Sequence, residues 1–296
     1  MRKAFSLIEL SIVILIIGIL VAGVTQSSRL IKQMRLQVAR NITTSSPVTS
    51  IKDLKIWLET SQEGSLISST NGLNPDNNDK ISSWNDISPQ LITKINPSQS
   101  NDTLRPLYAE TSPINNLPAL KFNSNEYLET IASGSNQMPL AIGDDTFTFI
   151  AVWNSLSLST TQAIFEQNTG NSLISGNRAS MLIIGSIYGY NGEGNDYQPT
   201  SFTINSSRIS VITVDNGAVN IYDNKLNTPT NTGSINNAIQ NVSEGGFFIG
   251  TKGTNPRSEK FNGFISEIIV FDRVLKKSEI EDINLYLAKK YSIKLS

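Results

Sequence analysis

The chain has 296 residues, a formal net charge of −1 and 17% charged residues, and it contains neither cysteine nor histidine. The absence of cysteine excludes disulfides and thiolate metal sites, and the absence of histidine excludes Ser-His-Asp, Cys-His and His-zinc chemistry. A net charge this close to zero creates no overall field that would attract nucleic acid.

The N-terminus has the composition of a membrane-spanning helix. Two cations, Arg2 and Lys3, precede an apolar run from Phe5 to Val24 in which Glu9 is the one charged residue. About 20 apolar residues form a helix long enough to cross the ~30 Å hydrocarbon core of a bilayer. We therefore expect the chain to start in a membrane.

Glu9 is the anomaly in this helix, because a charge near the centre of a spanning helix costs ~2.5 to 3.5 kcal/mol, and somewhat less near its end. The string RKAFSLIEL from Arg2 to Leu10 resembles the leader of type IV prepilins and type II secretion pseudopilins. The resemblance implies that a prepilin peptidase cuts between Ala4 and Phe5 on the cytoplasmic side and methylates Phe5. It also implies that Glu9 pairs with the α-amino group of a neighbouring pilin or pseudopilin subunit.

Two other interpretations of the N-terminus are an uncleaved signal anchor and a conventional signal peptide cut near residues 21–23. Both explain the apolar run and the basic flank, but neither explains Glu9. Ala4 departs from the glycine that usually precedes the cut, and because alanine is also small we expect slower or normal processing. Cations lie on both sides of the span, so the N-in orientation depends on the resemblance alone.

A helical rhythm continues beyond the apolar run, with Leu30, Met34 and Val38 at four-residue spacing. Hydroxyl residues followed by Pro47 end the pattern, since proline disfavours helix in the residue before it. The sequence thus predicts a leader (1–4), a transmembrane and stem helix (5–42), a linker (43–50) and a head (51–296).

The head changes to the pattern of a β-protein. Short β-branched and aromatic runs are separated by turn residues, and Asp215-Asn216-Gly217-Ala218 is a strong hairpin signal. Many short strands without intervening helices predict a two-sheet sandwich, most plausibly a jelly roll, and Ser278 with Glu281 predicts the capped start of a short closing helix. The expected fold is therefore mainly β, with one long N-terminal helix and a short C-terminal one.

Several motifs of the head resemble the laminin-G-like, concanavalin A-like jelly rolls of bacterial surface proteins. They include LKIWL, ISSWNDIS, RPLY, LPALKF, EYL and FNGFISEIIVFDRVL, and the resemblance covers residues 51–296. It implies a two-sheet sandwich that binds a carbohydrate or a protein. Retaining glycosidases of this shape carry E-x-D-x-x-E on one strand, a string that does not occur here. We therefore expect no enzyme.

Two surface features are candidate ligand sites. Asp76, Asn78 and Asp79 offer hard oxygens for Ca²⁺, which would be the one cofactor, although the same letters are typical of a tight turn. The segment 188–197 is Gly-rich, and we expect it to be a loop that faces the ligand through three tyrosines: Tyr188, Tyr190 and Tyr197. Trp57, Trp84 and Trp153 are expected in the core.

These features together predict a minor pilin or pilin-like filament subunit with a lectin-like head for adhesion. Before assembly it would sit in the bacterial inner membrane as a single-pass, N-in protein, and afterwards in a periplasmic or extracellular filament. The alternatives are a type II secretion pseudopilin that contacts cargo and a membrane-tethered binding module that never polymerises. A head of about 245 residues is large for a repeating shaft subunit, which favours a tip or low-copy position.

Overall fold

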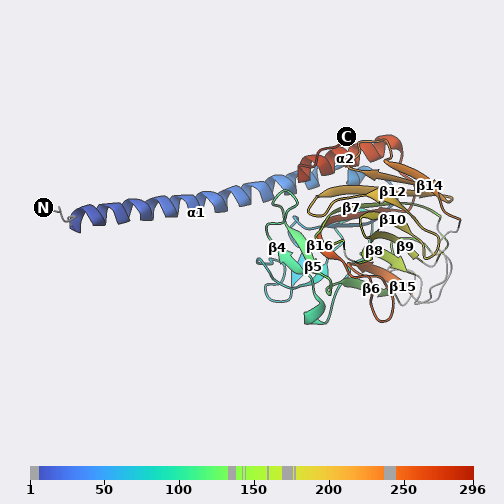
Figure 1. Cartoon of the computed structure of the whole chain (residues 1–296), viewed down its shortest axis with the longest axis horizontal. Coiled ribbons are helices and arrows are strands. Elements are labelled where there is room, and N and C mark those ends of the chain that lie inside the picture. The colour runs from blue at the N-terminus through green and yellow to red at the C-terminus, as the bar shows by residue number, and fades with distance from the viewer. Residues whose placement is uncertain are drawn as a thin grey trace.

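The computed structural model describes residues 7–132, 138–141, 143, 145–158, 160–168, 176, 178–236 and 245–296. A single long helix, α1, projects from a layered head, and its N-terminal end lies far from the head (Figure 1). In the head, a C-terminal helix covers one sheet and a second sheet lies beneath the first (Figure 1). The architecture is a β-sandwich of two large sheets, as the sequence predicts.

Helix α1 is described from Leu7 to Thr44 and is long and apolar enough to cross a membrane, with a mean hydropathy of 2.9 in its most apolar window, none of which is buried. Its hydroxyl groups bond back to carbonyls one turn earlier, as Thr25 does to Val21 at 3.0 Å. This keeps polar groups satisfied inside an apolar helix. Residues 43–50, expected as a linker, hold the end of α1 and the 3₁₀ helix η1 (Pro47–Ser50).

One sheet has eight antiparallel strands in the order β14-β13-β12-β7-β16-β5-β4, with β1 also paired to β16. The long central strands β7 and β16 pair over most of their length, and the predicted Asn216-Gly217 turn joins β12 to β13. The strand bounds are β1 (Leu54–Glu59), β4 (Leu107–Ala109), β5 (Ala119–Asn123), β7 (Thr146–Ser155), β12 (Arg208–Asp215), β13 (Ala218–Asp223), β14 (Asn231–Ser234) and β16 (Asn262–Phe271).

The other sheet has six antiparallel strands in the order β11-β10-β9-β8-β15-β6. A small hairpin of β2 and β3 and a 3₁₀ helix η2 complete the strand-rich part. The bounds are β2 (Leu66–Ser68), β3 (Ile81–Trp84), η2 (Asp102–Leu104), β6 (Leu128–Ala132), β8 (Gln162–Asn168), β9 (Arg178–Ile184), β10 (Ile187–Asn191), β11 (Tyr197–Ser201) and β15 (Gly245–Ile249).

Two apolar cores hold these layers together. The first lies between the sheets and is rich in aromatic rings, such as Phe149 and Phe165, whose centroids are 5.0 Å apart edge to face. The second lies between the outer face of the eight-stranded sheet and helix α2 (Lys277–Tyr291), and Ala39 of α1 joins it. Trp84 and Trp153 are fully buried and Trp57 is 2% exposed, so the predicted core placement of all three is confirmed.

The N-cap of helix α2 lies two residues before the predicted one. Lys276 is the cap residue instead of Ser278, and its backbone N–H donates to Glu279 Oε2 at 2.7 Å. Arg273 explains the shift, because its guanidinium holds the other side of the Glu279 carboxylate at 2.8 Å. The side-chain hydrogen bond from Arg273 lowers the pKa of Glu279.

Gly217 is the position where the fold depends most clearly on glycine. Its φ is +90°, and a Cβ there would lie 2.5 Å from the carbonyl oxygen of Ile235. We expect Gly217→Ala to lower the free energy of unfolding by about 1–3 kcal/mol, measured by urea titration. Gly72→Ala is the matched control, since its φ is +64° but nothing lies within 4 Å of the added atom. Equal losses in the two variants would contradict the steric account.

Candidate functional site at the junction of stem and head

The head holds α1 by its last two turns. Ala39 and Thr43 are the buried residues of the described helix, and Ile42 packs against the same apolar core as α2. Val48 of η1 is fully buried directly afterwards. The residues before Ala39 are largely exposed, although Lys32 makes an ion pair with Glu110 of the head at 3.4 Å. The apolar contact between stem and head is therefore confined to the end of α1.

Polar contacts at the rim fix the direction in which α1 leaves the head. Arg40 donates from Nε to the carbonyl of Ser61 at 2.8 Å and from Nη1 to Glu63 at 2.6 Å. Gln62 returns a bond to the carbonyl of Arg40 at 2.9 Å. Glu63 is well exposed, so this ion pair adds less than about 1 kcal/mol and serves mainly to orient the helix.

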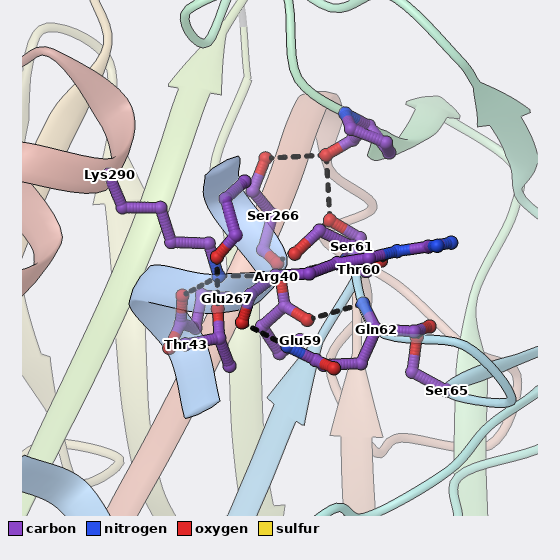
Figure 2. A network of polar contacts seen from close by, with 12 residues as sticks. Arg40, Thr43, Glu59, Thr60, Ser61, Gln62, Ser65, Ser266, Glu267 and Lys290 are labelled. Carbon is purple, nitrogen blue, oxygen red and sulfur yellow. Dashed lines mark hydrogen bonds and ion pairs between the residues drawn. The ribbon is translucent and has the colours of Figure 1, made fainter. Parts of the chain in front are cut away.

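Beneath this rim lies a buried cluster of three charged side chains. Glu59 on β1 and Glu267 on β16 stand directly opposite each other in the strand register. Two like charges in such a pair repel unless a cation lies between them. Lys290 of α2 supplies it: Nζ is 2.5 Å from Glu59 Oε1 and 3.0 Å from Glu267 Oε2, and all three side chains are at most 1% exposed (Figure 2).

Each carboxylate has its own set of further donors. Glu59 accepts from the backbone N–H of Ser61 at 2.7 Å and of Gln62 at 2.8 Å. Glu267 accepts from three aromatic side chains at 2.7–2.8 Å, namely Trp57, Tyr286 and Tyr291. The Tyr286 hydroxyl also lies 3.4 Å from Thr43 Oγ1, so the cluster reaches the stem helix.

Burial changes the pKa of Glu267 and of the two tyrosines that donate to it. Burial raises the pKa of Glu267. Attraction to Lys290 acts in the opposite direction, and repulsion from Glu59 adds to the increase. Burial also raises the pKa of Tyr286 and Tyr291 well above the ordinary value, so both hydroxyls stay protonated and can donate. The cluster of Glu59, Glu267 and Lys290, called the lock below, therefore joins the first strand, the last strand and the last helix of the head.

Glu9, the predicted assembly residue, lies outside this junction. Ala4 and Phe5 fall outside the described residues. Glu9 lies in the first described turns of α1, where its side chain is exposed on a helix of otherwise apolar residues. This is the end of α1 that lies far from the head (Figure 1).

The expectation that segment 188–197 is a ligand-facing loop is wrong. Tyr188 and Tyr190 lie on strand β10 with 0% and 1% exposure and point into the core between the sheets. Tyr197 starts β11, is half-buried and donates to the carbonyl of Thr232. Gly189 gives the reason: a Cβ there would lie 2.2 Å from Tyr197 O, so this glycine permits close strand pairing and does not mark a flexible loop.

Asp76, Asn78 and Asp79 form a surface turn. Asp79 Oδ2 accepts from Ser68 Oγ at 2.8 Å, from Asn71 Nδ2 at 2.8 Å and from the Asp76 N–H at 2.9 Å. Across the described residues, no group of three His, Cys, Asp or Glu side chains is placed to hold a metal ion. The hydrogen bonds account for these residues as a turn, and calcium binding there stays a prediction.

The buried cluster was missed in the sequence, although one signal pointed to it. Glu267 stands inside the apolar strand sequence FISEIIVF, in the same way that Glu9 stands inside an apolar helix. A carboxylate in such a run needs a partner. The partner, Lys290, lies on another element, α2, and no pattern in the sequence links it to Glu267.

The fold and the long helix together define a lectin-like β-sandwich on an apolar helical stem. A family model described as "Concanavalin A-like lectin/glucanases superfamily" matches residues 124–281, just over half of the chain, and one described as "Prokaryotic N-terminal methylation motif" matches residues 1–25. The chain therefore belongs to the concanavalin A-like lectin/glucanases superfamily and carries a prepilin-type N-terminus. No curated protein sequence matches the chain.

Several solved structures are similar in fold. Domain 4 of AbnA, a GH43 extracellular arabinanase from Geobacillus stearothermophilus, in complex with arabinotriose, has 16% identity and a TM-score of 0.47 over 78% of this chain and 98% of that one. Trypanosoma rangeli sialidase in complex with sialic acid has 14% identity and a TM-score of 0.48, with 90% of this chain and 39% of the sialidase covered. The CBM40 of Ruminococcus gnavus IT-sialidase, bound to α2,3-sialyllactose, has 15% identity and a TM-score of 0.40 over 47% of this chain and 82% of that one.

Lys290 offers the sharpest test of the lock. Lys290→Met leaves two facing carboxylates buried without their cation, and we expect it to lower the free energy of unfolding by about 3–5 kcal/mol. Lys289→Met, at the exposed neighbouring position, should change it by less than about 0.5 kcal/mol. Chemical unfolding followed by tryptophan fluorescence measures both, and equal effects would show that the buried charge is not needed.

Glu267 should give stability a pH dependence of defined sign. Because its folded pKa is raised above the ordinary 4.5, its contribution to stability is largest below that pH and is lost as the pH rises through the raised value. The free energy of unfolding of the wild type minus that of Glu267→Gln should therefore fall as the pH rises from 4.5 toward neutrality. Asp282→Asn on the exposed face of α2 is the control, and a difference that rises with pH would contradict the assignment.

Proposed function

We propose that the protein is a minor pilin or pilin-like filament subunit whose apolar helix stays in the mature chain and whose lectin-like head is displayed for adhesion or ligand binding. The exposed state of α1 is the observation that supports this most. Its apolar residues run from Leu7 to Val24 without any cover from the head. Such a helix needs an apolar partner, which a bilayer provides before assembly and other subunits' helices provide afterwards.

The N-terminal methylation motif supports a defined processing route. A prepilin peptidase would cut between Ala4 and Phe5 and methylate Phe5, and the chain would wait in the inner membrane as a single-pass, N-in protein. The cut would lie ahead of the apolar run, so processing would remove the leader and keep the helix. The mature subunit would then reside in a periplasmic or extracellular filament.

Glu9 would align the helices of neighbouring subunits during filament assembly. In the bilayer its carboxylate is costly, by up to ~2.5 to 3.5 kcal/mol at a helix centre. The positive α-amino group of a neighbouring subunit's Phe5 offsets that cost only when the two helices are in register. Assembly is thereby favoured over free diffusion in the membrane.

The head would be a binding module for a carbohydrate or a surface protein. Membership of a superfamily that includes lectins supports a glycan as the first class to test. The two carboxylates that meet at the junction, Glu59 and Glu267, are fully buried under α2, so a sugar cannot reach this acidic pair. The large head at the end of a slender stem supports a tip or low-copy position.

Substitution of Glu9 separates assembly from simple anchoring. We expect Glu9→Leu to insert into the membrane at least as well as the wild type, because a charge is removed, but to be lost at least tenfold from the sheared filament fraction. Ser11→Leu is the matched control: it makes the same helix more apolar two residues further on and should be incorporated normally.

Normal incorporation of Glu9→Leu would overturn the register role. If the wild type is recovered only in membranes and never in filaments, the protein is a membrane-tethered binding module that does not polymerise. A wild type that supports protein secretion and is absent from surface filaments would identify a type II secretion pseudopilin.

A further inference from the structure

The buried cluster places an amine against a carboxyl group, and both side chains are 0% exposed. Lys290 Nζ lies 2.5 Å from Glu59 Oε1, and the carboxyl carbon is one C–O bond, ~1.2 Å, beyond that oxygen. The aromatic rings of Tyr286 and Tyr291 enclose the amine, with centroids 5.7 and 5.0 Å from Nζ. An enclosed pair held in contact has the proximity that turns a slow bimolecular reaction into a fast intramolecular one.

The Glu59 carboxyl group is also held in a fixed orientation by two backbone donors. The N–H of Ser61 donates to Oε1 at 2.7 Å, and the N–H of Gln62 donates to Oε2 at 2.8 Å (Figure 2 shows Glu59 with both residues). Two fixed backbone donors on the oxygens stabilise the negative charge that develops there when a nucleophile adds to the carbon. Glu267 has no backbone donor of this kind among its described partners, which are side chains.

Glu267 stands where a proton acceptor is needed. Its Oε2 is 3.0 Å from Lys290 Nζ, within reach of direct proton transfer. Burial raises its pKa, so it holds a proton more readily than a carboxylate in water. The charged Lys290 must lose a proton before it can act as a nucleophile, and this carboxylate can take it.

We propose that Lys290 Nζ and Glu59 Cδ form an intramolecular amide (isopeptide) bond. The ammonium group of Lys290 gives one proton to the Glu267 carboxylate, and the free amine adds to Cδ of Glu59. The second amine proton and the proton held by Glu267 pass to one Glu59 oxygen, which leaves as water. The ammonium and carboxylate become a neutral amide plus one water, and Glu267 returns to its starting state with the hydrogen bonds from Trp57, Tyr286 and Tyr291 still in place. No oxidant or co-reactant is required.

The bond would close the head covalently at the point where the stem pulls on it. Glu59 ends β1, the first strand after the stem, and Lys290 lies in the last turns of α2, the final element of the chain. A subunit without cysteine cannot use a disulfide for this purpose. Lys290 also borders a surface hollow of about 360 Å³ between α1 and α2.

Mass spectrometry of the folded full-length chain tests the proposal directly. We expect a proteolytic digest to contain a branched peptide that joins Glu59 to Lys290 and is lighter by one water than the sum of its two parts. Lys290→Arg and Glu267→Gln should both lack the branched peptide, the first because it has no amine nucleophile and the second because it has no proton acceptor. Lys289→Arg is the matched control and should retain it.

Linear peptides for both segments in a chain that circular dichroism shows to be folded would overturn the proposal and leave an ordinary buried ion pair. A branch to Glu267 instead of Glu59 would overturn the assigned roles of the two carboxylates. Neither result depends on leader cleavage or filament assembly, so the outcome is independent of the proposed function.

Discussion

The exposed apolar surface of α1 is the constraint on which the rest of this structure depends. Each Leu or Ile side chain that is left in water forgoes about 1.5–3 kcal/mol of burial energy, and the described helix presents such residues on all sides from Leu7 to Val24. A chain with this helix is stable only where the surroundings are apolar. The head, in contrast, buries two apolar cores of its own, and the final turns of the helix pack into the second of them.

The junction attaches the exposed helix to the self-contained head. The stem must hold the head firmly, yet only Ala39, Ile42 and Thr43 contribute to the shared core. The buried cluster compensates for this small contact, because Lys290 locks β1, β16 and α2 together directly beneath it. The stem therefore meets the head beside this cluster, where the Tyr286 hydroxyl lies 3.4 Å from Thr43 Oγ1.

Much of this architecture follows from local sequence patterns. The membrane and stem helix, its end near Pro47, the Asn216-Gly217 hairpin and the two-sheet head were predictable, because each has a short-range signature in periodicity or turn chemistry. The tyrosine-rich segment was mispredicted, since a glycine that allows close strand pairing and a glycine that marks a loop look alike in sequence. Only the packing of β11 against Gly189 distinguishes them.

The buried cluster was beyond prediction for a different reason. Glu59, Glu267 and Lys290 come together only through the pairing of β1 with β16 and the docking of α2 across it. No local pattern encodes that long-range contact. A lone carboxylate inside an apolar run, seen at both Glu9 and Glu267, was the available sign that a distant cation would be required. At Glu267 the cation belongs to the same chain, whereas at Glu9 we propose that it belongs to a neighbour.

The most direct test of the central claim is the N-terminal sequence and mass of the protein isolated from membranes, with and without the host's prepilin peptidase. The account predicts a mature chain that begins at methylated Phe5 when the peptidase is present and an intact Met1 when it is absent. A chain that begins at Met1 in both strains, or beyond Ala22, would contradict the account, because the apolar helix would then be a plain anchor or a discarded signal.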